Sequence, residues 1–250
     1  MNIRFCHTNY ADGAVISASS EVASLPAVNV QNMWRSKPWR STGCVSEWLK
    51  FNLGAARNIL AVILTGHNLT SAATVHVQAN ASDVWTSPSV DVTVAWSARD
   101  LVYLWALAQA YQWWRITIAD PANSDGFIEL GRVYVGLAPA PDRNFSSYTR
   151  QAVDPTVISG STDGAESFED KNVYNVYAFE FAGILVDELE NLVKVVGLKE
   201  YWWIIADYEN VLEADGKHDL TAYVRFNSLP QYGHVYMTRK NASLDLREAL

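Results

Sequence analysis

Residues 111–136, YQWWRITIADPANSDGFIELGRVYVG, contain two strand-like runs on either side of a loop rich in Asn, Asp and Gly. Side chains along a β-strand point alternately to its two faces, so Trp113 and Trp114 project in opposite directions. Trp114 shares its face with two isoleucines, which predicts that its ring belongs to a hydrophobic core. Trp113 shares its face with Arg115, and its ring is either part of the framework or a platform for a ligand.

Further strand-like segments precede this stretch. In residues 47–54, Trp48 and Lys50 fall on one face and Leu49 and Phe51 on the other, as expected of a half-buried strand. The complete set of predicted strands in this half is 47–54, 58–69, 73–80, 90–96, 113–120 and 127–136. Many short strands separated by Gly, Asn, Asp, Ser and Pro, without a convincing long helix, predict an antiparallel β-sandwich.

The second half has a mixed pattern. Residues 184–197 place five apolar side chains on one helical face, namely Leu185, Leu189, Leu192, Val193 and Val196. Acidic residues occupy the early turns of this helix and a glycine ends it, in agreement with the helix dipole and with C-capping. Strand-like runs surround it at 172–183, 201–207, 221–227 and 233–250. We therefore predict a smaller α+β domain with one amphipathic helix.

A proline-containing segment separates the two halves. Pro139 and Pro141 remove backbone donors and favour an extended chain, and eight of the ten tryptophans precede them. We predict a β-sandwich over residues 1–138, a linker over 139–147 and an α+β domain over 148–250.

Charge is distributed unevenly between these halves. Residues 1–138 carry 9 Lys or Arg and 9 Asp or Glu, whereas residues 139–250 carry 10 and 18, a net charge of −8. An acidic surface repels phosphates, so nucleic acid is not an expected partner. Apolar runs are too short to span a bilayer, which needs about 20 residues, and the N-terminus lacks a signal-peptide core. We expect synthesis in a cytoplasm, without membrane insertion.

Few residues indicate reaction chemistry or metal binding. Cys6 and Cys44 are too few for a disulfide framework, although either a bridge or two free thiols is compatible with the sequence. His67 and His76 are expected to be satisfied polar residues, and the loop at 120–126 lacks the spacing of a helical-hand calcium site and is expected to be a turn. The sequence predicts no enzyme activity and no metal or other cofactor.

The first half resembles the discoidin, or coagulation-factor C-terminal type, β-sandwich. The residues that carry this resemblance are the segments 18–32, 34–36, 47–54 and 113–136, in that order. The resemblance implies a jelly-roll sandwich that binds ligands with loops at one end. It also implies a structural role for Arg115, and Glu129 matches the final acidic residue of the family's pattern. The disulfide that often joins the two ends of this family is absent here.

The second half is similar to small tail proteins of bacteriophages. The similarity lies in residues 177–207, YAFEFAGILVDELENLVKVVGLKEYWWIIAD, where an aromatic strand, a helix rich in Leu and Glu, and a second aromatic strand follow one another. This resemblance implies a structural virion protein of the tail tip or baseplate. The implied partners are other tail subunits, in a symmetric oligomer. The implied location is the tail of the virion, after synthesis in the host cytoplasm.

The segment 33–41, MWRSKPWRS, is the main candidate for ligand binding. It combines the aromatic rings of Trp34 and Trp39 with the guanidinium groups of Arg35 and Arg40. Aromatic faces stack on sugar rings, and guanidinium groups hydrogen-bond hydroxyls and carboxylates. Together with Trp113, this set is our predicted site for a bacterial surface glycan. The alternative is that both tryptophans cap the core and the basic groups meet a partner subunit.

Two functions follow from these observations. The first is a structural tail protein that acts by protein–protein association. The second is a carbohydrate-binding module that recognises a surface glycan of a bacterium. A glycan hydrolase is a third hypothesis that only fold-level association favours.

Overall fold

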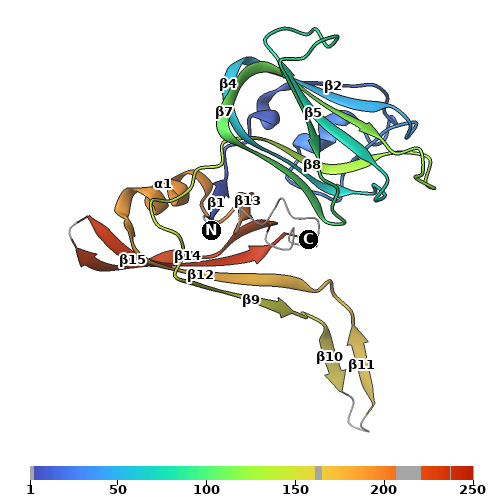
Figure 1. Cartoon of the computed structure of the whole chain (residues 1–250). Helices are drawn as coiled ribbons and strands as arrows, with labels where there is room; N and C mark the ends of the chain where they lie inside the picture. The colour runs from blue at the N-terminus through green and yellow to red at the C-terminus, as the bar shows by residue number, and fades with distance from the viewer. Residues whose placement is uncertain (1–2, 161–164, 207–220, 237, 250) are drawn as a thin grey trace. The chain divides into compact units, whose positions relative to one another are not determined.

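The computed structural model describes residues 3–160, 165–206, 221–236 and 238–249 (Figure 1). It is mainly β, with antiparallel sheets and one α-helix among these residues, which confirms the predicted fold class. The chain divides into two compact units, one formed mainly by residues 3–139 and the other by residues 140–204 and 222–249. No helix in the described ranges is long and apolar enough to cross a membrane.

The first unit contains eight strands and two short 3-10 helices. These are β1 (Arg4–Cys6), η1 (Tyr10–Gly13), β2 (Val15–Ala18), η2 (Ala27–Gln31), β3 (Trp39–Arg40), β4 (Glu47–His67), β5 (Thr74–Asn80), β6 (Val90–Val94), β7 (Asp100–Ala119) and β8 (Glu129–Gly136). Strands β3, β8, β4, β7, β5 and β6 are hydrogen-bonded in that order, and β2 pairs with β4.

Two long strands, β4 and β7, run through both layers of the sandwich. The first part of β4, residues 47–52, pairs with residues 113–118 of β7, and its later part, 57–65, pairs with residues 100–111. The register shifts between Asn52 and Arg57, where Gly54 has a φ of 75°. A bulge of this kind bends a strand, so one continuous strand replaces the two predicted at 47–54 and 58–69.

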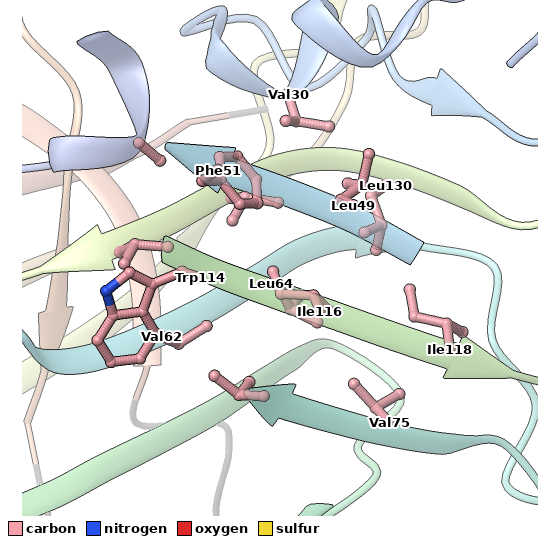
Figure 2. Close-up of a cluster of buried hydrophobic side chains, with 14 of the residues drawn as sticks. Val30, Leu49, Phe51, Val62, Leu64, Val75, Trp114, Ile116, Ile118 and Leu130 are labelled. Atoms are coloured by element: carbon pink, nitrogen blue, oxygen red, sulfur yellow. The ribbon is translucent and has the colours of Figure 1, made fainter. Parts of the chain in front are cut away.

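The side chains that were predicted to face the core of the first unit are buried. Trp114 is 1% exposed, and Leu49 and Phe51 are fully buried. Figure 2 shows the Trp114 ring directed into the same cluster as Ile116 and Ile118 of its own strand. The ring of Trp114 is therefore part of the hydrophobic core, as predicted.

Seven strands and the helix lie in the described residues of the second unit. Its elements are β9 (Ser147–Val153), β10 (Val157–Gly160), β11 (Glu166–Glu169), β12 (Tyr174–Leu185), α1 (Val186–Val196), β13 (Trp202–Ile205), β14 (Thr221–Tyr236) and β15 (Arg239–Glu248). Within this unit β13, β14, β15, β12 and β9 follow one another in the sheet, and β10 pairs with β11. The strands at 147–169 were not predicted. The predicted strand at 233–250 is divided between β14 and β15, and residue 207 of the predicted strand 201–207 lies outside the described residues.

The amphipathic helix agrees with its prediction. Leu189, Leu192 and Val196 are buried, and Gly197 follows the helix with a φ of 57°, a conformation that favours glycine. The helix begins two residues later than predicted because β12 continues to Leu185.

Neither cysteine is part of a disulfide. Cys6 is buried, and burial raises the pKa of its thiol well above the ordinary value, whereas Cys44 is half-buried. The loop at 120–126 forms turns, as predicted, and the Asp120 carboxylate accepts bonds from the backbone and hydroxyl of Thr70, both at 2.7 Å. Within the described ranges, no group of three His, Cys, Asp or Glu residues is placed to hold a metal ion.

Candidate functional site

Trp39 does not belong to a ligand site. Its side chain is fully buried, and its indole Nε1 donates a hydrogen bond to the Ser20 carbonyl oxygen at 3.0 Å. A ring without exposed surface cannot stack on a sugar. The expectation that Trp39 contributes a binding face is therefore wrong, and the alternative that it caps the core is correct.

Arg40 forms an ion pair between two neighbouring strands. It lies directly opposite Glu129 in the β3–β8 ladder, and its Nε donates to Glu129 Oε1 at 2.6 Å. Its guanidinium carbon also lies 4.1 Å from the centre of the Phe127 ring, a distance typical of a cation–π contact. These contacts hold the beginning of β8 against β3, so Arg40 has a framework role.

Trp34 is the exposed aromatic residue of the 33–41 segment. Its side chain is 50% exposed, and its backbone N–H donates to Asn32 Oδ1 at 3.1 Å. The neighbouring Arg35 is half-buried, with its backbone close to Gly131. Of the four residues predicted in this segment, the structure thus leaves one aromatic ring open to solvent.

Trp113 lies elsewhere, on the outward face of the layer formed by β5, β6 and the paired parts of β4 and β7. It is opposite Asn52 on one side and Asn80 on the other. The Lys50 ammonium nitrogen lies 5.5 Å from the centre of the Trp113 ring and 5.5 Å from the centre of the Trp48 ring. Lys50 therefore lies between or beside two neighbouring indole rings, at the same distance from each ring centre.

The loop between β5 and β6 adds two residues to this cluster. Asp83 accepts a hydrogen bond from Lys50 Nζ at 2.7 Å and another from Trp85 Nε1 at 2.6 Å. The Trp85 ring in turn lies 4.5 Å from the Arg115 guanidinium carbon. The loop is thereby attached to the sheet through two cationic side chains of the sheet, Lys50 and Arg115.

A row of polar side chains continues across the same sheet. Arg115 donates from Nε and Nη2 to Gln78 Oε1, at 2.8 and 2.6 Å, and Gln78 Nε2 donates to Asp91 Oδ2 at 2.9 Å. Asp91 also lies 2.9 Å from the Nδ1 atom of His76. The basic groups are thus matched by acceptors, and the face carries little excess charge.

We call this cluster the tryptophan–lysine face, and it consists of Trp48, Lys50, Asp83, Trp85, Trp113 and Arg115. It offers half-buried aromatic surface beside groups that donate and accept hydrogen bonds. Of these residues the sequence prediction included only Trp113. The available signal was the strand alternation, which already placed Trp48 with Lys50 and Trp113 with Arg115. The alternation pattern could not show that β4 and β7 are neighbours in the sheet.

The contacts of the Asp83 carboxylate with Lys50 and Trp85 depend on pH. Its hydrogen bond with Lys50 is the main cause that lowers its pKa, with further help from Trp85. A lowered pKa means that these contacts stabilise the fold fully above the unfolded-state pKa, about 3.9. Their contribution is lost as the pH falls through the lower folded-state pKa.

We expect the indole ¹H–¹⁵N resonance of Trp85, assigned with Trp85→Phe, to stay constant from about pH 8 to about pH 5, because Asp83 remains ionised there. It should move only in more acidic solution. In Asp83→Asn it should be displaced at every pH, since the charged acceptor is gone. A Trp85 resonance that titrates around neutral pH would contradict this assignment of contacts.

No protein-family model and no curated protein matches the chain. Solved structures similar to it include chitosan-binding module 2, in complex with chitotriose, of a chitosanase/glucanase from Paenibacillus sp. IK-5; the identity is 19%, the TM-score is 0.42, and the match covers 52% of this chain and 100% of that one. Another is the lectin domain of lectinolysin complexed with Lewis B antigen, with 14% identity, a TM-score of 0.42, and coverage of 51% and 95%. A third is the family 32 carbohydrate-binding module of C. perfringens NanJ in complex with galactose, with 17% identity, a TM-score of 0.42, and coverage of 53% and 98%.

Similarity at this level carries no conclusion about what this chain binds. The comparisons cover about half of the chain. The role in a phage tail remains a prediction.

Proposed function

We propose that the first unit is a glycan-binding module whose ligand lies on the tryptophan–lysine face. The observation that carries the proposal is the position of Lys50, whose ammonium nitrogen is 5.5 Å from the Trp48 and Trp113 ring centres and 2.7 Å from Asp83. The face thus combines two aromatic surfaces with a donor and an acceptor that are held in fixed positions.

A pyranose ring suits such a surface because its C–H groups and its hydroxyl groups point in different directions. Its axial C–H groups form an apolar patch that stacks on an indole. Its equatorial hydroxyls point sideways, where they both donate and accept hydrogen bonds. On this face Lys50 and Arg115 supply donors, and Asp83 supplies an acceptor.

The matched charges favour a neutral glycan. Lys50 is paired with Asp83, and Arg115 is bonded to Gln78, which is itself bonded to Asp91. A strongly acidic polysaccharide would have to compete with these internal partners. A neutral oligosaccharide can add hydrogen bonds to these groups without breaking their internal pairs.

A glycan array tests the proposal with three proteins. The wild-type chain should bind one or more neutral glycans, with chitotriose, galactose and fucose-containing oligosaccharides among the probes. Trp113→Ala should bind the same glycans at least about tenfold more weakly, because truncating a contacting tryptophan typically costs more than 1.4 kcal/mol. Trp34→Ala, which changes an exposed tryptophan outside this face, is the matched control and should bind like the wild type. Absence of binding by the wild type, or equal binding by Trp113→Ala, would overturn the proposal.

A structural place on a virion tail is our second proposal. The similarity of residues 177–207 to phage tail proteins supports it, and a tail protein that binds a glycan would contact the host surface. An antibody against this chain should label the tails of the source particle in negative-stain images. Labelling confined to other parts of the particle, or no labelling, would contradict the tail location while leaving glycan binding open.

A further inference from the structure

We propose that copies of this chain associate head to tail through two surfaces of the second unit. One surface is the arm, the β10–β11 hairpin with residues 157–160 and 165–169. The other is the groove, formed by residues 193–200 at the end of α1 together with Leu229 of β14. The proposal does not depend on glycan binding, because both surfaces lie outside the first unit.

The arm presents an apolar pair to solvent. Ile158 and Phe168 are directly opposite each other in the β10–β11 ladder, so their side chains lie on the same face. Each is 61% exposed. Glu166 is two residues from Phe168 and therefore belongs to the same face. The arm thus carries an apolar patch with an acidic edge.

A hairpin of this kind gains little stability by itself. Two-stranded hairpins are marginal in water unless a third strand or another surface covers them, and every described residue of β10 and β11 is exposed. Figure 1 shows the two strands as a narrow extension of the second unit. Covering Ile158 and Phe168 would stabilise the arm and remove apolar surface from water.

The groove has the complementary character. It is a shallow surface depression of about 470 Å³, and three apolar side chains on its rim are exposed, by 62% for Val195, 46% for Leu198 and 49% for Leu229. Lys194 and Lys199 lie beside them, and Glu200 is the one acidic side chain among the described lining residues. An apolar groove flanked by two lysines suits an apolar arm with an acidic edge.

The occupant of the groove is the arm of a second copy. Residues 139–250 have a net charge of −8, so a cationic groove is a local exception that attracts the acidic edge of another copy. Within one chain the arm precedes the start of β12 and α1 follows its end, and the 12 residues of that strand span on the order of 40 Å. The exposure of both patches shows that they do not cover each other within one chain.

This contact joins two different surfaces and therefore repeats. Each copy uses its arm on one neighbour and its groove on the other. Such heterologous contacts close into rings when the rotation between copies allows it and otherwise give open chains. For a glycan-binding module, repetition would also raise the avidity for a surface that displays many copies of the glycan.

Two variants that each lack one surface provide a direct test. The arm variant carries Ile158→Asp with Phe168→Asp, and the groove variant carries Leu198→Asp with Leu229→Asp. All four positions are exposed, so both variants should keep the circular dichroism spectrum of the wild type and unfold in a cooperative thermal transition. Leu107→Asp, at a residue of the first unit that is 78% exposed, is the control for adding charge at an apolar surface position.

Sedimentation velocity of the full chain distinguishes the outcomes. The wild type and Leu107→Asp should form species larger than a dimer at concentrations up to about 100 μM, and each double variant should be monomeric. An equimolar mixture of the two variants should form a dimer and nothing larger, because only one intact arm and one intact groove remain. A monomeric wild type, oligomers that persist in either variant, or a mixture that stays monomeric would each overturn the proposal.

Discussion

Replacing Trp39 by alanine should lower the free energy of unfolding of the first unit by about 3–5 kcal/mol, the usual cost of removing a large buried aromatic side chain. The ring is fully buried, and its Nε1–H bond to the Ser20 carbonyl would be lost together with its apolar contacts. The surrounding strands can collapse into the resulting cavity only in part. Chemical denaturation, followed by circular dichroism, measures the change.

Trp34→Ala is the matched comparison, because it removes the same side chain five residues away. Its ring is 50% exposed, and surface substitutions of this kind usually change stability by no more than about 0.5 kcal/mol. Similar decreases in the free energy of unfolding for the two variants would contradict the conclusion that Trp39 is buried and Trp34 is exposed.

Gly136→Ala should destabilise the first unit by about 3 kcal/mol, the upper part of the range for overpacked positions. A Cβ at this position would lie 2.0 Å from the Thr8 carbonyl oxygen and 2.7 Å from the Tyr134 side chain. Because the first of these contacts involves backbone, a rotamer change cannot relieve it. The N-terminal segment pairs with β8 at this point through Asn9, and it would have to move away.

Gly13→Ala is the control for this substitution, since a Cβ there would meet nothing within 4 Å. Thermal unfolding should show a large decrease in Tm for Gly136→Ala and little change for Gly13→Ala. A Gly136→Ala variant with the wild-type Tm would show that the N-terminal segment does not approach β8 so closely.

The inward faces of the strands could be predicted from sequence because burial leaves a periodic pattern. Leu49, Phe51 and Trp114 were assigned to the core on alternation alone. The same pattern could not show that β4 continues through its bulge, since Gly54 resembles the end of a strand. The β10–β11 hairpin was missed for the opposite reason, because strands with both faces exposed have no apolar alternation to detect.

The site was harder to predict because it depends on which strands are neighbours. Lys50 and Trp113 are far apart in sequence, and each was placed on a polar face without any indication that the two faces are one. The pairing of β4 with β7 brings them together. Trp39 was misjudged because β3 has only two residues, too few to reveal a buried face.

Binding of a glycan to the tryptophan–lysine face can be followed directly by a titration of the indole ¹H–¹⁵N resonances. The titrant is the glycan selected on the array, and tryptophan-to-phenylalanine variants assign the signals. We expect the resonances of Trp48, Trp85 and Trp113 to shift together with one dissociation constant, while those of Trp34 and Trp39 stay in place. Shifts confined to Trp34, or binding that leaves Trp48 and Trp113 unmoved, would contradict glycan binding on this face.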